Sequence, residues 1–572
     1  MGPENNKYRY YILLFALIIS YHFINNFLWL ENSISIQGVD TSNHLLFQLR
    51  FQRLFDRIFS EPNTSLIFKI KELVKLFKLP MDQVSAYWPN FVFFSSTIFS
   101  AFFGNTLFII KLSMLPYLLI LLFSTYLIGE IISNKRTGLL AMFLVSVYPL
   151  IFESSRQFGL DFPLTALVTI SVLLLLKSDY FKSTYFTILL GISTGAGLLI
   201  KGQFIIFIIW PLIAILGSYL FKNNKLRLSG RVILNVIIFI VISVCVASLW
   251  WQDKIEAVVR QFVTHTTSSA KFLESGNSLQ DFRGVNFYLF HLKALVFGST
   301  GVTFALLFFC SLPGFIKTKF KYKLMILSWV LIPFLLFSIV FVVKHDRFLM
   351  PILPAVAIIS AWGVEHMRAS KTKSRLIIFL VILGLIQYWI LSYFYSPYKD
   401  TVRKNKLLDI FGSSSYGASP NYNFKKINFI KEIADLIDKD CGGINNCKIG
   451  MVILSRNIPT FEILYWLSYW SPNLYFFDCI DQYTDFFKEL PNLSYLIFVS
   501  RKSDKLYWPK GKELLDLLST YHNANFTRIQ EEHPESWTTE IGKISLYESK
   551  FNSFETFEFP SRTYWYIYKR KP

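Results

Sequence analysis

Four consecutive residues, Lys344-His345-Asp346-Arg347, form the most chemically distinctive cluster in the sequence. Arginine offers a planar fork of donors and lysine a mobile point charge, and this combination suits a phosphate group. Pro351 follows closely and is expected to distort the start of the next helix, as happens where a helix lines a site. The cluster therefore predicts a phosphate site, although a turn that anchors to lipid headgroups would have the same composition.

A second candidate is the carboxylate of Asp40, which follows the first long apolar block. Asp40 and His44 are four residues apart and would share one face of a helix. A carboxylate on a face that opens to an external cavity is a suitable general base. The alternative is that Asp40 or Thr41 is an ordinary helix N-cap in a loop.

Three further charged residues interrupt apolar sequence. Arg156 and Asp161 lie in a short turn before Pro163, which is well placed in the first turn of a helix. One interpretation has Asp161 cap that helix and pair with Arg156, and the other has both face the same cavity as Asp40. Lys201 stands between two apolar blocks, where it either contributes to that cavity or extends to the membrane interface.

The elements that must position these residues are transmembrane helices. The chain has 572 residues, is 53% hydrophobic and carries a formal net charge of +20. Its apolar residues form blocks of about 20, the length that crosses ~30 Å of hydrocarbon as a helix. This pattern excludes a soluble protein and predicts eleven spanning helices at 10–30, 107–131, 138–153, 163–177, 185–200, 204–221, 231–251, 293–312, 323–343, 348–366 and 375–395.

The distribution of basic residues predicts the orientation of these helices. Lys and Arg gather in alternate short turns, which is how membrane topology is encoded and not how a nucleic-acid groove is lined. With a cytoplasmic N-terminus, the basic turns are 1–9, 132–137, 178–184, 222–230, 313–322 and 367–374. The short turns on the opposite side hold only Arg156, Lys201, Lys344 and Arg347. We therefore predict a multi-pass protein of the plasma or inner membrane, with these four cations on the extracytoplasmic side.

Three larger pieces are expected on that side: 31–106, 252–292 and 396–572. The first contains an amphipathic stretch, Leu45–Phe59, and a short apolar segment, Phe91–Phe103, both predicted to be interfacial or re-entrant helices. In the tail, strand-like runs at 448–454, 474–477, 495–499 and 563–568 alternate with helical patterns at 460–470, 483–490 and 512–521, so an α/β domain is predicted. Cys441 and Cys447 flank a short loop and form a disulfide if the compartment is oxidising, or remain free thiols if it is not.

The sequence contains no motif of a cofactor or metal site. The eight histidines are scattered, and there is no His-x-x-His, Cys-x-x-Cys, nucleophile elbow or nucleotide-binding loop. We therefore predict no cofactor, and the dependence on a divalent metal stays open.

Taken in order along the chain, these residues resemble the GT-C glycosyltransferases, in particular the branch of the protein O-mannosyltransferases and the bacterial lipid A aminoarabinose transferase. The resemblance covers roughly residues 1–395, a predicted transmembrane domain. This sequence departs from the family at Thr41, where the family usually has an acidic residue beside the first Asp. The motifs that carry the resemblance are Asp40 with His44, Tyr87-Trp88-Pro89, Tyr148-Pro149, Arg156…Asp161-Phe162-Pro163-Leu164, Gly197-Leu198-Leu199-Ile200-Lys201-Gly202 and residues 344–354 from Lys344 to Pro354.

The resemblance implies a fold and a mechanism. A sugar on a polyprenyl phosphate enters from the bilayer, and its phosphate is bound by Lys344, Arg347 and either or both of Lys201 and Arg156. Asp40 acts as general base toward an acceptor hydroxyl, with inversion at the anomeric carbon, and Asp161 orients the acceptor or Arg156. The other site candidates are His44, His345 and Tyr87.

The implied partners are a polyprenyl-phosphate sugar, the lipid bilayer and an acceptor that is a protein, a lipid or a glycan, with no nucleic acid. A transporter or flippase of lipid-linked sugars is the main alternative function. A non-catalytic membrane anchor that presents its tail to a partner is a third.

Overall fold

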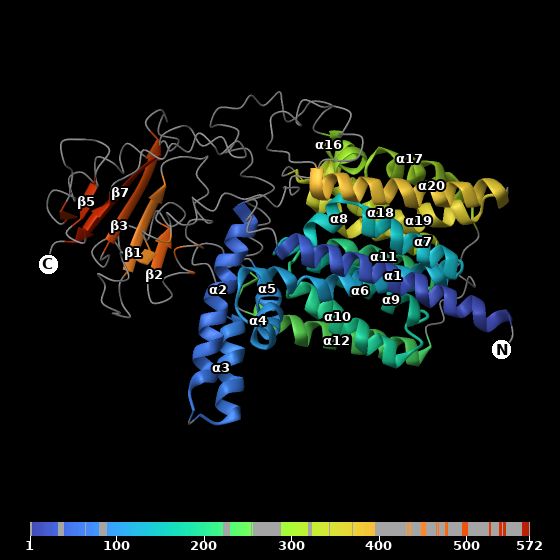
Figure 1. Cartoon of the computed structure of the whole chain (residues 1–572). Coiled ribbons are helices and arrows are strands. Elements are labelled where there is room, and N and C mark those ends of the chain that lie inside the picture. Colours follow the sequence, from blue (N-terminus) through green and yellow to red (C-terminus); the bar gives the residue numbers. More distant parts are fainter. Residues whose placement is uncertain are drawn as a thin grey trace.

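The computed structural model describes a bundle of helices and, apart from it, a small sheet (Figure 1). The described residues of the helical part are 3–31, 39–62, 64–78, 88–220, 229–252, 254–255, 288–318, 323–341, 344–368 and 370–394. In the tail they are 431, 434–435, 465, 467, 469, 448–453, 475–478, 495–501, 526–527, 537–539, 542–544 and 563–570.

Helices occupy all eleven ranges in which the sequence predicts a span. Within the described ranges, six helices are long and apolar enough to cross a membrane, and one bent pair raises this number to seven. The protein is thus a polytopic membrane protein, and the number of eleven spans stays a prediction. The helices of the bundle are α1 (Pro3–Glu31), α5 (Leu107–Leu112), α6 (Leu115–Ile132), α7 (Lys135–Val147), α8 (Pro149–Ser154), α9 (Asp161–Lys177), α10 (Thr184–Leu198), α11 (Phe204–Leu220), α12 (Gly230–Trp251), α16 (Phe290–Lys293), η2 (Ala294–Ser299), α17 (Val302–Lys317), α18 (Lys323–Leu335), η3 (Leu336–Val340), η4 (Asp346–Ile352), α19 (Leu353–Glu365), α20 (Ser370–Trp389) and η5 (Ile390–Phe394).

Two of the predicted spans are broken helices. The predicted span 293–312 begins as α16 and η2, bends by 119° and continues as α17, with Gly301 at the bend in the left-handed region (φ 85°). The predicted span 138–153 breaks at Tyr148-Pro149, where α8 begins with the proline in its first turn. Proline lacks an amide hydrogen, so it starts a helix without losing a hydrogen bond. Breaks of this kind direct loop and helix ends toward one end of the bundle.

Small residues let neighbouring helices approach closely. A Cβ on Gly195 would lie 2.5 Å from Val246 Cβ, and a Cβ on Gly138 would lie 2.5 Å from the carbonyl oxygen of Tyr126. Helices α10 and α12, and helices α6 and α7, therefore pack with their backbones nearly in contact, as in membrane bundles that are stabilised by close packing.

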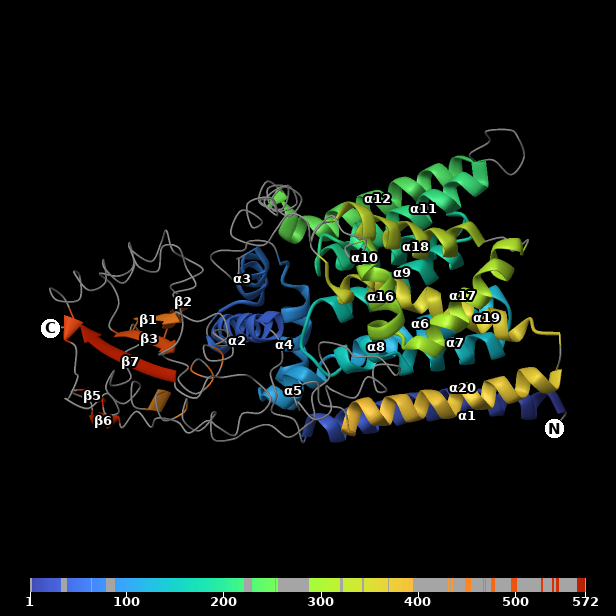
Figure 2. The ribbon, with the colours of Figure 1, turned by 90° about the horizontal axis from the view of Figure 1, so that it is seen from above.

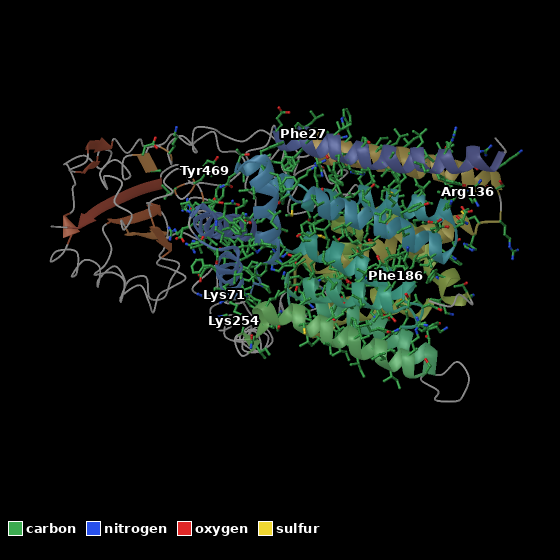
Figure 3. All side chains as sticks on the ribbon, turned by 90° about the horizontal axis from the view of Figure 1, so that it is seen from below. Phe27, Lys71, Arg136, Phe186, Lys254 and Tyr469 are labelled. Carbon is green, nitrogen blue, oxygen red and sulfur yellow. The ribbon has the colours of Figure 1, made fainter. Side chains whose placement is uncertain are left out.

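The turns fall at two ends of the bundle as the charge pattern predicts. At the end that holds the N-terminus, Arg136 Nε donates to the Tyr11 hydroxyl (3.3 Å) and Lys373 pairs with Glu365 (3.0 Å). Figure 3 shows Arg136 at this end and Lys254 at the other. The alternation of turns agrees with the predicted topology, and the assignment of the ends to cytoplasm and exterior stays a prediction.

The predicted external segment 31–106 contains three helices: α2 (Val39–Ser60), α3 (Leu66–Lys78) and α4 (Phe91–Phe103). Helices α2 and α3 run across the direction of α1 and α12 at the end of the bundle opposite the N-terminus (Figure 1). Gln48 on α2 donates to Thr97 on α4 (2.9 Å), and Asn90 donates to the carbonyl oxygens of Leu76 and Phe77 at the end of α3. The three helices thus form one unit that covers this end.

The tail contains the predicted strands. Strands β1 (Lys448–Ile453), β2 (Tyr475–Asp478), β3 (Tyr495–Arg501), β4 (Phe526–Thr527) and β7 (Thr563–Arg570) form a sheet in the order β2-β1-β3-β7-β4. Strand β1 is parallel to β2 and β3, and β7 is antiparallel to β3 and β4. Strands β5 (Trp537–Thr539) and β6 (Gly542–Ile544) form a separate antiparallel pair.

The predicted helices of the tail, the boundary at 396 and the cysteines 441 and 447 lie outside the described residues. The α/β domain at 396–572 therefore stays a prediction, although the parallel pairing of β1 with β2 and β3 is what such a domain requires.

Candidate active site

The carboxylate of Asp161 binds two cations at the end of the bundle covered by α2. Lys201 Nζ lies 2.7 Å from Asp161 Oδ1, and Arg347 Nε lies 3.6 Å from Asp161 Oδ2. The three side chains keep 12–17% of their surface exposed, so the cluster is largely shielded from water but still accessible. Charges in such a place interact more strongly than on an open surface because screening is weaker.

Three separate elements bring these side chains together. Asp161 is the first residue of α9, and its backbone carbonyl accepts from Thr165 Oγ1 (2.8 Å). Lys201 lies in the turn between α10 and α11, and this turn needs Gly197 because a Cβ there would lie 2.2 Å from the Phe204 ring. Arg347 is on η4, which Trp329 Nε1 fixes through a hydrogen bond to the Pro351 carbonyl (3.0 Å).

The ring of Phe348 contacts both cations. Lys201 Nζ lies 5.6 Å and Arg347 Cζ 5.9 Å from its centroid. Cations are attracted to the face of an aromatic ring, and the effect grows when water is excluded. Phe348 therefore helps to orient Lys201 and Arg347 toward the same region.

Lys344 has its own contacts nearby. Its ammonium donates to the carbonyl oxygens of Phe337 (2.6 Å) and Ser338 (2.8 Å) on η3. A π-helix leaves carbonyl groups at its end without helical partners, and a lysine satisfies them. The residue lies in the loop between two candidate spans, and burial lowers the pKa of Lys344 to about 8. The positive charge of Lys344 is therefore lost in a pH range just above neutral.

The two histidines of this region have different surroundings. His345 is exposed, and its ring packs edge-on to Phe348 at 5.3 Å between centroids. Its carbonyl oxygen is 3.2 Å from Nε2 of His291, which is buried on α16. The backbone of the Lys344–Arg347 turn is thereby tied to the broken helix.

Helix α2 places His44 beside the turn that carries Asp161. The His44 ring packs against Trp88 at 4.9 Å, and its Nδ1 lies 3.9 Å from the position of a Cβ on Gly159. Asp40 belongs to the first turn of α2, one turn before His44, and its side chain lies outside the described residues. Tyr87 also lies outside them. The predicted roles of Asp40 and Tyr87 therefore stay predictions.

Arg156 is in a different environment from the one predicted. Its side chain is 2% exposed, and its guanidinium donates to Asn26 Oδ1 (2.9 Å), Ser392 Oγ (2.9 Å) and the Tyr388 hydroxyl (2.6 Å). It also lies over the rings of Trp29 and Tyr388. These contacts argue against a direct phosphate contact, and within the described chain the ion pairs of Asp161 go to Lys201 and Arg347 instead.

Glu153 and Gln157 were not among the predicted site residues, although both are polar residues in the turn region before Asp161. Each is 4% exposed, and within the described part of the chain no hydrogen bond reaches the side-chain oxygens of Glu153 or the amide of Gln157. Glu153 directly follows the apolar stretch Pro149–Phe152 at the end of the predicted span 138–153, and a charged residue inside a predicted span is the signal that would have identified it. Asn26, Tyr388 and Ser392 gave no such signal, because they become functional only as partners of Arg156.

The described residues contain no group of three or more histidine, cysteine or acidic side chains that would hold a metal ion.

Comparison with known proteins identifies the class of fold. Residues 88–251, under a third of the chain, match the sequence model of the family described as dolichyl-phosphate-mannose-protein mannosyltransferase. The matched part includes Asp161 and Lys201. No curated protein matches the chain by sequence.

Two solved membrane proteins share the fold. ArnT from Cupriavidus metallidurans, in a structure bound to undecaprenyl phosphate, superposes with a TM-score of 0.53 at 12% identity, over 92% of this chain and 96% of that one. The arabinofuranosyltransferase AftD from Mycobacteria superposes with a TM-score of 0.50 at 9% identity, over 98% of this chain and 40% of that one. These findings confirm the resemblance to GT-C glycosyltransferases, and at such identities the structural likeness concerns the fold.

The hydrogen bonds of Arg156 generate a prediction about stability. We expect Arg156→Leu to lower the free energy of unfolding by about 2–4 kcal/mol, because three buried polar partners lose their donor at once. The measurement is the midpoint of thermal unfolding of the purified protein in detergent. Arg136→Leu is the matched control, since this exposed arginine donates one long hydrogen bond to Tyr11 and its loss should cost under ~0.5 kcal/mol. Unchanged stability of Arg156→Leu would contradict the structural role.

Proposed function

We propose that the protein is a membrane glycosyltransferase that transfers a sugar from a polyprenyl-phosphate donor to an acceptor hydroxyl. The observation that carries the proposal is the cluster of Lys201, Arg347 and Asp161, shielded from water at the ends of membrane helices. A site of this kind suits an anionic group on a lipid, because it offers fixed cations at the level where a lipid headgroup lies.

The donor phosphate is proposed to bind to Lys344, Arg347 and Lys201. As the bond between the anomeric carbon and the phosphate oxygen breaks, negative charge builds on the leaving polyprenyl phosphate, and fixed cations stabilise it. Asp161 is then the residue that holds Lys201 and Arg347 in place. The contacts of Arg156 support a role in bundle packing for that residue, in place of the predicted phosphate contact.

Asp40 is proposed as the general base. It would take the proton of the acceptor hydroxyl while the oxygen attacks the anomeric carbon from the face opposite the phosphate, which inverts the configuration. A phosphate leaving group needs little protonation, so one base is sufficient. Support comes from helix α2, where His44, one turn after Asp40, packs beside Gly159, close in the chain to Asp161.

The proposal names the chemical class of the lipid carrier and of the acceptor. The solved ArnT structure contains undecaprenyl phosphate, which supports a polyprenyl carrier for this chain. The acceptor is proposed to carry a hydroxyl and to reach the site from the extracytoplasmic side, and proteins, lipids and glycans all satisfy this description. The predicted tail domain at 396–572 lies on the same side in the predicted topology.

One observation favours a transporter or flippase as a second candidate function. The bend of 119° between η2 and α17 is a discontinuous helix, a feature of many transporters. Transporters, however, place their charged groups near the bilayer midplane, whereas Asp161, Lys201 and Arg347 lie at helix ends. Movement of a labelled lipid-linked sugar across proteoliposomes without formation of a new glycosidic bond would favour the transporter.

The role of Asp40 is tested by Asp40→Asn. We expect turnover of a labelled polyprenyl-phosphate sugar to fall by about 10²–10⁴-fold, because the amide does not accept the proton. The assay uses purified protein in nanodiscs with an extract of candidate acceptors, and mass spectrometry of the product identifies sugar and acceptor together. Asp56→Asn on the exposed side of the same helix is the matched control and should keep normal turnover. Near-normal turnover of Asp40→Asn would exclude Asp40 as the base.

The role of the cations is tested by Lys201→Met and Arg347→Met. Each substitution removes one charged contact to the donor phosphate, so we expect the donor KM to rise about tenfold or more. The control is Lys182→Met, which removes an exposed lysine that pairs with Asp179 in a predicted cytoplasmic turn. An unchanged KM in both site variants would contradict a phosphate site here.

The lowered pKa of Lys344 predicts a pH dependence. Burial disfavours the charged ammonium, so its positive charge is present below pH 8 and is lost as the pH rises through about 8. The value of kcat/KM for the donor reports on the free enzyme and should therefore fall between pH 7 and pH 9. Lys344→Arg keeps the charge over this range and should flatten the profile. The same decline in both proteins would assign the pH dependence to another group.

A further inference from the structure

Helix α3 presents an apolar stripe to the outside of the protein. Leu66 is 70% exposed, Ile67 68%, Ile70 52% and Val74 38%. Spacings of three, four and seven residues place these side chains along one side of the helix. Phe68, about half a turn away from this stripe, is also exposed (44%), and α3 packs on the protein through its last turn, where Leu76 is buried and the Phe77 ring packs against Phe51 at 6.2 Å and Phe94 at 4.9 Å.

Three lysines follow one edge of this stripe. Lys71, Lys75 and Lys78 are spaced by four and three residues and therefore lie in a row next to Ile67 and Val74. Lys71 and Lys75 are exposed, and Lys75 pairs with Glu72. Because Glu72 is the only acidic residue of α3, the helix keeps a positive charge beside an apolar surface.

The position of α3 relates this surface to the membrane. Lys78 Nζ donates to Gln252 Oε1 (3.4 Å), directly after the candidate span α12, which ends in Trp250 and Trp251. Tryptophans at the end of a span mark the membrane–water interface. From this point α3 runs across the direction of α12 and extends past it, away from the bundle (Figures 1 and 2).

Helix α2, the predicted interfacial helix of this segment, directs much of its apolar surface into the protein. Most of the apolar residues in its first half, among them Leu45, Phe47 and Phe51, are buried in the protein. Apolar side chains are instead exposed along α3, at Phe59 at the end of α2, and at Ile98, Phe102 and Phe103 on α4. Residues 66–78 were not among the predicted interfacial helices.

We propose that α3 lies on the bilayer at this end of the bundle, with Leu66, Ile70 and Val74 among the acyl chains and Lys71, Lys75 and Lys78 on anionic lipid headgroups. Charge complementarity selects this partner over a second copy of the chain, because two copies would place rows of lysines side by side. The surface is distinct from the proposed active site, so its test does not depend on glycosyl transfer.

The first experiment measures depth and lipid preference with a fluorophore at position 70. An environment-sensitive dye is attached to Ile70→Cys after Cys245, Cys310, Cys441, Cys447 and Cys479 are replaced by serine. The protein is placed in nanodiscs of equal parts phosphatidylcholine and phosphatidylglycerol, with a nitroxide on the acyl chain of one or the other lipid. We expect strong quenching, and quenching by the phosphatidylglycerol label that exceeds that by the phosphatidylcholine label by about twofold or more.

The lysines provide the matched variant. In Lys71→Gln/Lys75→Gln/Lys78→Gln we expect quenching to persist while the preference for phosphatidylglycerol disappears, because the apolar stripe is intact and the charge is gone. Absence of quenching at position 70, or a dye signal that changes with protein concentration, would overturn the proposal in favour of a protein partner. Equal quenching by both lipids in the parent would overturn the assignment of anionic lipid.

A second measurement uses the chain with its natural cysteines. The lipids that remain bound during purification from the mixed membranes are quantified for the wild type and for the triple glutamine variant. Enrichment of phosphatidylglycerol in the wild type and its loss in the variant support the proposal. The same lipid composition in both would contradict it, even if the labelled protein fails to fold.

Discussion

The arrangement of the site depends on one constraint: a charged group at the edge of a low-dielectric layer must have a partner. Asp161 meets it by binding Lys201 at 2.7 Å and Arg347 at 3.6 Å, from elements that are far apart in the chain. The ring of Phe348 contacts both cations. The opposite charges of this cluster are partners of one another at a position that is largely shielded from water.

Arg156 also has partners, but these partners are neutral. Here Asn26, Ser392 and Tyr388 are neutral acceptors, and the side chain is almost completely buried. Arg156 thereby links the turn after α8 to α1 and to the end of α20 with η5. Helices α1 and α20 lie more than 200 residues apart in the chain. Arg156 and Lys201, which the sequence places in neighbouring turns, thus differ in their surroundings: Arg156 is enclosed by acceptors, whereas Lys201 remains partly accessible.

The sequence was sufficient to predict the helices of the bundle, but neither helix α3 nor the contacts between the elements. Apolar blocks identify the ranges of all eleven predicted helical segments, since the pattern depends only on local composition, and the strands of the tail follow from local runs in the same way. The bend at Gly301 and the break before α8 depend on tertiary packing and were not predicted. The pairing of Asp161 depends on the turn at Gly197 and on η4, which no local pattern contains. For the same reason the sequence left Arg156 with two interpretations, and neither included Tyr388.

The cations that depart from the predicted charge bias are the best guide to function in this protein. A lysine or arginine on the side of the membrane that is poor in positive charge works against the signal that orients the chain, so its retention needs a local reason. The structure shows a local contact for each of the four cations in these short turns. Arg156 joins helices, Lys344 donates to the carbonyl groups at the end of η3, and Lys201 and Arg347 share Asp161. Lys201 and Arg347 both stay partly accessible while they share one carboxylate, and this is the reason why we propose them, and not Arg156, as ligands of an anionic group.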